Sequence, residues 1–268
     1  MVSIVIPSRN EKYLQKTIQD LLTKAKGKIE IIAILDGWWQ EANEIVNHPS
    51  VKYIHFSDAR GMRNAINSGV AIAKGEYILK LDAHCMVGEG YDEVLKASCE
   101  DNYVVVPRRY RLDPDKWCIR EDKPTPIDYM YLSKDLHGVI WDEKNNDPEL
   151  EKKKIDDLMS SQGSCWLMKK KYYQELELLD EASYGTFYNE FQEIGLKCWL
   201  SGGRVIVNKN TWCAHWHKTK DVGRGYTLNK GEQERAVAFT EKWKDKGWHK
   251  QIHPISWLVE KFKPVPTW

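Results

Sequence analysis

The sequence predicts an α/β protein with a mostly parallel central sheet flanked by helices and a small helical extension at the C-terminus. Three observations support this class. Apolar runs typical of buried strands alternate with helical periodicity over the first eighty or so residues. Polar clusters directly follow several of those runs. The chain of 268 residues with 42% hydrophobic residues is long enough for one large domain or at most two small ones.

The first part of the chain shows the order strand, helix, strand, strand, helix, strand. We expect strands at residues 2–7, 29–35, 52–56 and 76–81, and helices at 13–25 and 60–73. Such β-α-β units connect parallel strands through crossover helices.

The rest of the chain is less regular. Residues 101–154 contain several prolines and many charges, which predicts a long excursion with one or two strands. Strands are then expected at 164–168 and 204–208, and helices at 169–179, 190–200 and 232–246, with a further short helix after residue 253.

The composition excludes several classes of protein. Lys and Arg number 40 against 39 Asp and Glu, whereas a dedicated nucleic-acid binder usually has a strong basic excess. No signal-peptide pattern begins the chain, and no apolar run reaches the roughly 18–20 residues of a spanning helix. The six cysteines contain no CxxC pair. These features predict a soluble, cytoplasmic protein with no transmembrane segment and with reduced thiols.

Three polar clusters follow the predicted strands at their carboxyl ends. Ser8 follows the first strand, Asp36 follows the second, and Asp82 and His84 follow the fourth. Because the carboxyl ends of parallel strands face the ligand crevice, these clusters should converge.

The stretch ILKLDAHC, residues 78–85, combines a carboxylate and an imidazole. Asp82 and His84 alternate with apolar neighbours and therefore point the same way. One oxygen and one nitrogen ligand suit a divalent ion such as Mn²⁺. For an isolated pair, a turn cap and a buried histidine are the more common explanation. His215 and His217, which share one face of an extended segment, favour the metal site.

Several linked motifs resemble the core of GT-A glycosyltransferases of the family-2 type. The segment ARGMRNAINSGVAIAKGEYILKLDAHC (59–85) resembles their helix leading into the metal-binding D-x-D motif. The D-x-H form is that of polypeptide N-acetylgalactosaminyltransferases and their bacterial and phage relatives. The segments IVIPSRNE (4–11), IEIIAILDG (29–37), QGSCWLMKKKYY (162–173) and NEFQEIGLKCWLSGG (189–203) resemble further motifs in the same order. The likeness covers roughly residues 2–217.

The resemblance implies a metal-dependent transfer of a sugar from a nucleotide diphosphate sugar, UDP-sugar above all, to a hydroxyl. The metal, Mn²⁺ or Mg²⁺, would be held by Asp82, His84 and His215, which lies twelve residues after Gly203. The acceptor is a protein, a glycan, a small molecule or a modified DNA base.

The resemblance and the residue types also suggest contacts to the donor and the acceptor. The expected donor contacts are Pro7, Ser8, Arg9, Glu11, Asp36, Arg60 and Arg63, with Lys218, Arg224 and Tyr226 in a lid loop over the diphosphate. The expected substrate contacts are Gly163, Trp166, Glu190 and Trp216.

Departures from the family pattern affect the expected mechanism. Leu35 and Ile66 replace residues common in the family, so that Asp36, Arg60 and Arg63 are left for base or phosphate contacts. Phe191 stands where inverting members carry a catalytic Asp. Glu190 could replace it as the base, or the enzyme retains configuration, which we slightly favour.

Glu190 and Glu193 are our candidate catalytic residues, since they lie three apart on one helical face. The alternative for that face is a solvated acidic surface in which Glu193 pairs with Lys197.

The expected organisation is a catalytic domain at residues 1–217, with a nucleotide-binding half (1–99) and an acceptor-binding half (100–217). Residues 218–268 would form the lid loop and the helical extension. A nucleotidyltransferase is a weaker alternative, because no Gly-rich loop follows the first strand. A non-catalytic sugar-nucleotide-binding module is another. The basic cluster Arg108, Arg109 and Arg111 could touch a phosphate backbone, but a solvated surface turn is the simpler interpretation.

Overall fold

The computed structural model describes residues 1–39, 45–218, 224, 226–245 and 247–268. Within these residues a sheet of ten strands has the central order β10–β12–β6–β11–β4–β1–β2–β3, with β5 paired to β12 and β7 to β6. Its strands are β1 (Val2–Ser8), β2 (Ile29–Asp36), β3 (Val51–Phe56), β4 (Tyr77–Leu81), β5 (Cys85–Val87), β6 (Tyr103–Asp113), β7 (Cys118–Ile119), β10 (Ile155–Asp157), β11 (Cys165–Lys169) and β12 (Arg204–His215). A separate hairpin joins β8 (Met130–Leu132) and β9 (Gly138–Ile140).

Most neighbouring long strands run parallel. β1 pairs in parallel with β2 and β4, β2 with β3, and β6 with β12. Only β11 reverses the direction at the centre, because it is antiparallel to both β4 and β6. The carboxyl ends of β1, β2, β4, β6 and β12 therefore lie along the same edge of the sheet.

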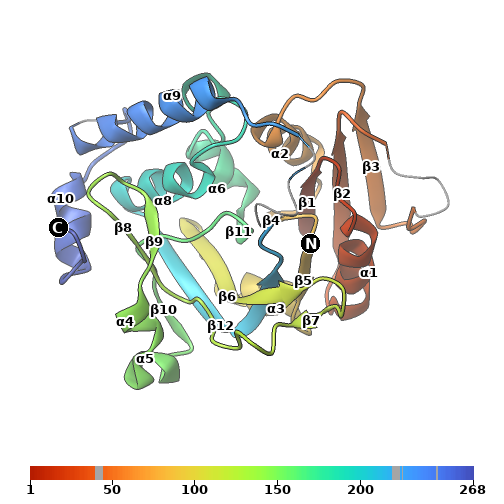
Figure 1. The fold of residues 1–268 in the computed structure, drawn as a ribbon, viewed down its shortest axis with the longest axis horizontal. Coiled ribbons are helices and arrows are strands. Elements are labelled where there is room, and N and C mark those ends of the chain that lie inside the picture. The colour runs from red at the N-terminus through yellow and green to blue at the C-terminus, as the bar shows by residue number, and fades with distance from the viewer. Residues whose placement is uncertain (40–44, 219–223, 225, 246) are drawn as a thin grey trace.

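Helices cover both faces of the sheet (Figure 1). They are α1 (Leu14–Lys24), α2 (Met62–Ile72), α3 (Tyr91–Ala97), α4 (Asp142–Asn145), α5 (Pro148–Lys152), α6 (Lys170–Glu175), α7 (Glu181–Tyr184), α8 (Glu190–Leu200), α9 (Lys230–Glu241) and α10 (Ile255–Lys261). Leu14, Ile18 and Leu21 of α1 pack with Ile4 and Ile6 of β1 in one core.

The second core lies on the opposite face, because successive strand residues point to opposite sides. It joins Val5 of β1 to residues of α2, α6, α8 and α10. The contact between α2 and β1 is close: a Cβ atom built on Gly69 would lie 2.5 Å from Val5 Cγ1. A larger residue at position 69 would push the helix away from the sheet.

Three expected elements differ from the observed ones. The helix predicted at 232–246 is α9, which already ends at Glu241. The helix predicted at 169–179 is only α6, since Glu177 has a φ of 53°, which an α-helix cannot contain. The strand predicted at 204–208 continues as β12 to His215, through a register shift after Asn208. Asn208 lies opposite Pro107 of β6, which has no N–H to donate. The hydrogen-bond ladder between β6 and β12 is therefore interrupted at this point.

The interpretation of residues 101–154 was also incomplete. This segment contains β6, a strand of 11 residues between β12 and β11. Pro107 and the charged residues of the strand are not typical of a central strand, so the sequence did not reveal it. Arg108, Arg109 and Arg111 belong to this strand, so the surface turn suggested for them was wrong.

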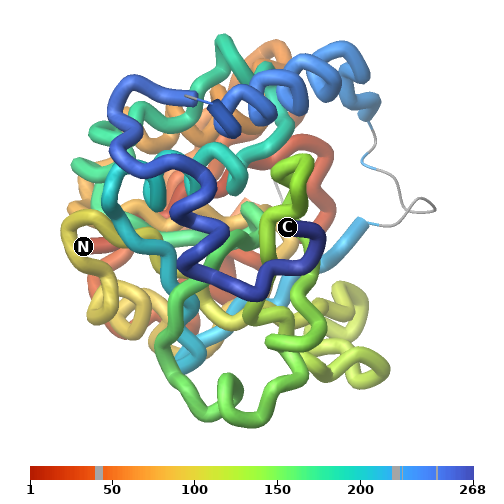
Figure 2. Tube along the Cα trace, turned by 90° about the vertical axis from the view of Figure 1, so that its left-hand side faces the viewer, coloured from red at the N-terminus to blue at the C-terminus, as the bar shows by residue number. Residues whose placement is uncertain are grey.

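The C-terminal residues return to the β8–β9 hairpin. Trp268 Nε1 donates to the Leu132 carbonyl at 2.7 Å, and the chain end lies beside the green β8–β9 segment (Figure 2). The expected helical extension is present as α9 and α10, while most of the expected lid loop, residues 219–223 and 225, lies outside the described residues. None of the described helices is long and apolar enough to cross a membrane.

Candidate active site

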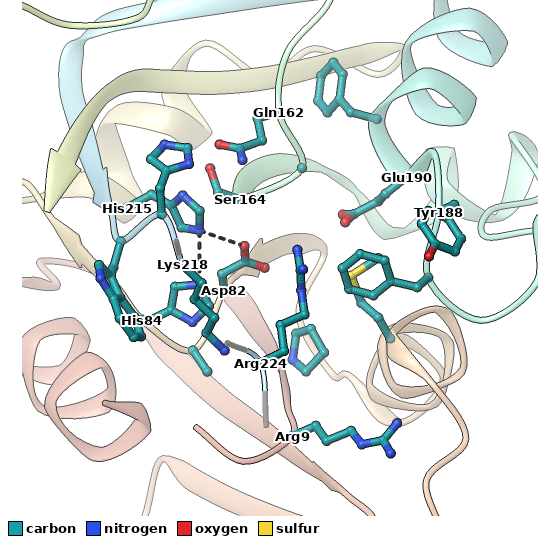
Figure 3. A pocket seen from close by; sticks show the side chains of 18 of the residues that line it. Arg9, Asp82, His84, Gln162, Ser164, Tyr188, Glu190, His215, Lys218 and Arg224 are labelled. Carbon is teal, nitrogen blue, oxygen red and sulfur yellow. Dashed lines mark hydrogen bonds and ion pairs between the residues drawn. The ribbon is translucent and has the colours of Figure 1, made fainter. Parts of the chain in front are cut away.

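A cavity of about 700 Å³ opens at the carboxyl edge of the sheet (Figure 3). Its wall includes Ser8 at the end of β1, Asp36 at the end of β2, Asp82 after β4 and His215 at the end of β12. The convergence expected from a parallel sheet is therefore present.

Asp82, His84 and His215 form a three-residue cluster on the cavity wall. One potential ligand atom of each lies within 4.8 Å of the other two. His215 Nε2 is 3.1 Å from His84 Nε2 and 3.2 Å from Asp82 Oδ2 (Figure 3). One carboxylate oxygen and two imidazole nitrogens facing a common point fit a divalent ion of the Mn²⁺ type.

Glu11 orients one of these histidines. Its Oε2 lies 2.9 Å from His84 Nδ1, which leaves Nε2 directed towards His215 and Asp82. Its Oε1 accepts a hydrogen bond from Lys218 Nζ. A carboxylate behind a histidine fixes the ring and its tautomer, which is the usual support of a metal ligand. Glu11 also lines the cavity, so the donor contact expected of it stays a prediction beside its support of His84.

Lys80 stabilises the ionised form of the Asp82 carboxylate. The Lys80 ammonium is fully buried and lies 2.6 Å from Asp82 Oδ1 and 3.2 Å from Glu190 Oε2. Burial alone would raise the pKa of the Asp82 carboxyl, but Lys80, His215 and His84 outweigh it and hold that pKa below its ordinary value. Asp82 is therefore ionised at neutral pH and available as a ligand.

Glu190 begins α8 and lies across the cavity from the histidines (Figure 3). Trp166 Nε1 donates to Glu190 Oε1 at 2.7 Å, and Lys80 contacts Oε2. Burial raises the pKa of the Glu190 carboxyl, and Lys80 opposes that change. Gly163 allows this packing, because a Cβ atom there would meet Glu190 Oε2 at 2.5 Å. Trp166 itself is fully buried and supports Glu190 from behind.

The expected donor side is built from β1 and β2. Pro7, Ser8 and Arg9 line the cavity, and in the described part of the chain the buried Ser8 hydroxyl has no hydrogen-bond partner. The Arg9 guanidinium lies 4.2 Å from the centre of the Tyr226 ring, and burial raises the pKa of Tyr226 to about 12. Asp36 also lines the cavity, and its carboxylate accepts backbone N–H groups of residues 60 and 61.

Two further residues that were expected to contact the substrates line the cavity. Trp216 is half-buried on the cavity wall, with its ring centre 5.7 Å from that of His84. Arg224 also lines the cavity, with its guanidinium 5.2 Å from the Phe187 ring centre.

Arg60, Arg63 and Glu193 are not among the described residues that line the cavity. Arg60 is exposed and lies over the Phe56 ring. Arg63 and Glu193 are fully buried and form an ion pair with each other. The donor contact expected of Arg63 and the catalytic role expected of Glu193 do not fit this placement, while the donor contact expected of the exposed Arg60 stays a prediction. Glu193 also pairs with Lys197, as its alternative interpretation expected, but in the core and not on a solvated face.

The sequence reasoning gave no role at the site to Lys80, which contacts Asp82 and Glu190, or to Arg109, which lines the cavity. A signal for Lys80 was present, since a lysine inside the buried run ILKL points to the same side as Asp82. Arg109 and its partner Gln162 line the cavity from β6 and the segment before β11. Their meeting depends on strand pairing that local sequence does not reveal.

Comparison with known proteins agrees with this geometry. Residues 3–177 match glycosyl transferase family 2. The chain belongs to glycosyl transferase family 2. It is an enzyme, and the predicted likeness to family-2 glycosyltransferases is confirmed, which favours sugar transfer over the nucleotidyltransferase alternative.

Curated relatives of this glycosyltransferase carry consistent names. Glycosyltransferase GlyG of Streptococcus pneumoniae is 31% identical over 42% of this chain and 40% of its own length. Polypeptide N-acetylgalactosaminyltransferase 3 of Mus musculus is 24% identical over 91% of this chain and 41% of its own length. The chain thus spans about two fifths of these relatives.

Solved structures show the same fold. A crystal structure of GalNAc-T7 with UDP, GalNAc and Mn²⁺ matches 97% of this glycosyltransferase and 54% of its own chain, with a TM-score of 0.72 at 18% identity. Staphylococcus aureus TarS matches 80% of this chain with a TM-score of 0.51. The predicted GT-A fold class, a mostly parallel sheet flanked by helices, is confirmed.

Proposed function

We propose that this glycosyltransferase moves a sugar from a UDP-sugar to a hydroxyl group in a reaction that needs Mn²⁺ or Mg²⁺. The observation that carries the proposal is the convergence of Asp82, His84 and His215 in the cavity at the carboxyl edge of the sheet. The donor class follows the structurally similar GalNAc-T7, whose crystal structure was solved with UDP, GalNAc and Mn²⁺.

The bound ion would neutralise charge on the diphosphate of the donor, as divalent ions do in phosphate chemistry. The chain itself supplies the rest of the donor site. Asp36, Ser8 and Arg9 line the side of β1 and β2, where the nucleoside would lie, and Lys218 and Arg224 add positive charge near the diphosphate. We assign nucleotide binding to residues 1–99 and acceptor binding to 100–217, with 218–268 as lid and helical extension.

We propose that Glu190 positions substrates and is not the general base. Both of its oxygens already accept hydrogen bonds from the protein, one from Trp166 and one from Lys80. These two bonds fix the carboxylate in place, which suits a residue that positions substrates, and the acceptor hydroxyl then loses its proton to another group. The leaving diphosphate can take that proton instead, with the hydroxyl attacking from the side on which the diphosphate departs. This arrangement supports retention of configuration.

A donor assay tests the proposed function. We expect hydrolysis of at least one UDP-sugar with Mn²⁺ present and loss of that hydrolysis after treatment with EDTA, with recovery when Mn²⁺ is returned. GDP- and CDP-sugars serve as matched controls for the base. Hydrolysis that continues in EDTA, or equal use of all three nucleotides, would contradict the metal or the donor assignment.

The anomeric configuration of the product tests the mechanism. NMR of the transfer product should show the configuration of the donor. The Glu190→Gln variant should keep a measurable rate, with a loss of about 10- to 100-fold, because the amide still accepts from Trp166 but no longer balances Lys80. An inverted product, with Glu190→Gln inactive while it still binds UDP, would show that Glu190 is the base.

A further inference from the structure

Arg109 is a buried cation without an anionic partner. Only 6% of the residue is exposed, and its Nη1 donates to the Gln162 amide oxygen while Nη2 lies 3.4 Å from Met130 Sδ. Its buried Nε has no hydrogen-bond partner in the described structure. Among the described residues it forms no ion pair, which is unusual because buried charges are normally paired.

The neighbouring arginine on the same strand is paired with carboxylates, as buried charges usually are. Arg108 contacts Asp128 at 2.6 Å and also pairs with Glu151. Successive residues of β6 point to opposite sides, so Arg108 lies with these carboxylates while Arg109 and Arg111 face the cavity. Asp128, already bound by Arg108, is not left to neutralise Arg109.

The register of β6 brings this positive charge near the metal cluster. Arg111 is the cross-strand partner of His215, and Arg109 is the partner of Cys213. Burial lowers the pKa of the Arg109 guanidinium to about 10, so the group remains charged at neutral pH. A fixed charge that faces a cavity and lacks a protein partner is suited to an anion on a ligand.

The position of Arg109 separates it from the donor side. In the sheet, β4 and its Asp82 divide β1 and β2 from β6. Gln162, the partner of Arg109, lies on the side of the cavity away from Arg9 (Figure 3). Met130, Gly138 and Ile140 of the β8–β9 hairpin complete this side.

We propose that Arg109 and Arg111 form an anion-binding subsite, and that the acceptor carries a carboxylate or phosphate group close to the hydroxyl that receives the sugar. The forked guanidinium of Arg109 binds this group, and Arg111 adds charge at the opening. This inference rests on the proposed glycosyl transfer, because it assigns the side of the cavity opposite the donor to the acceptor.

Anion binding to the full chain tests the subsite. The melting temperature of the wild type and of Arg109→Met is measured during titration with sodium acetate or sodium sulfate, against sodium chloride at equal ionic strength, with UDP and Mg²⁺ present. We expect one anion to stabilise the wild type, and its affinity to fall roughly 10- to 100-fold in the variant. A stronger acetate response identifies a carboxylate and a stronger sulfate response a phosphate. Equal responses of the two proteins overturn the subsite.

Two further variants separate binding from charge and from folding. Arg120→Gln removes an exposed cation from a surface pair and should respond to anions as the wild type does. Arg109→Lys keeps the charge without the fork and should retain part of the response. Without added anion Arg109→Met should melt above the wild type, because an unpaired buried charge is removed. A lower melting temperature would make Arg109 a structural residue and overturn the proposal.

The UDP-sugar hydrolysis assay distinguishes a failure of this inference from a failure of the proposed function. If no UDP-sugar is hydrolysed, the proposed function fails, while the anion titration without UDP still tests the subsite. If hydrolysis proceeds and Arg109→Met removes a preference for UDP-glucuronic acid over UDP-glucose, the carboxylate belongs to the donor sugar and the acceptor assignment is overturned.

Discussion

Replacement of His215 by alanine is expected to lower sugar transfer by at least roughly 10³-fold, because a metal contribution of several kcal/mol is lost with the ligand. His215 is the residue that connects the cluster, since its Nε2 lies within 3.2 Å of both His84 and Asp82. Its removal leaves Lys80 and its two carboxylates intact, so the fold should persist. Calorimetric titration with Mn²⁺ and the UDP-sugar assay measure the effect.

His217 provides the matched control for this variant. It shares the extended segment and lines the same cavity, but only His215 belongs to the three-residue cluster among the described residues. His217→Ala should therefore lose less than about tenfold in Mn²⁺ affinity, the lower limit for a residue that acts only behind the ligands. A His215→Ala protein that binds Mn²⁺ as the wild type does would exclude His215 as a ligand.

Arg63→Met is expected to destabilise the protein by about 3–5 kcal/mol, because it breaks a fully buried ion pair. Arg63 contacts Glu193 and donates to the Tyr188 carbonyl at 2.6 Å, so it ties α2 to the segment that leads into α8. Glu193 would keep Lys197 as a partner, which limits the loss. Urea unfolding measures the change.

The same variant decides between two roles for Arg63. If the residue is structural, the folded Arg63→Met protein should bind UDP with nearly unchanged affinity. If it contacts the donor, as the sequence suggested, UDP binding should weaken while stability changes little. The double variant Arg63→Met/Glu193→Met should not regain the lost stability, because it leaves the buried Lys197 without its carboxylate partner.

Local sequence was sufficient for the parts of the site that adjoin strand ends. The apolar run before Asp82 and the alternation through His84 place both side chains on one face, and the linked motifs add His215 from far along the chain. The helix predicted at 190–200 has the bounds of α8. These features depend on periodicity and on order along the chain, which a single sequence contains.

The remaining features depend on contacts between distant segments. Arg63 and Glu193 lie 130 positions apart, and no periodicity reveals that they meet in the core. Arg109 looked like part of a solvated basic cluster because β6 was hidden by Pro107. The role of Glu11 behind His84 likewise requires the loop after β1 to lie beside the loop after β4.

Lys80 also has a consequence for how the ion enters and leaves. The Asp82 carboxylate already has a permanent counter-charge within 2.6 Å, so an incoming cation shares a ligand that is partly neutralised. The favourable electrostatic free energy of cation binding is therefore smaller than it would be at a cluster of carboxylates without a counter-charge. Such a site favours turnover of the ion over tight retention, and it fits a cation that arrives and departs with the diphosphate.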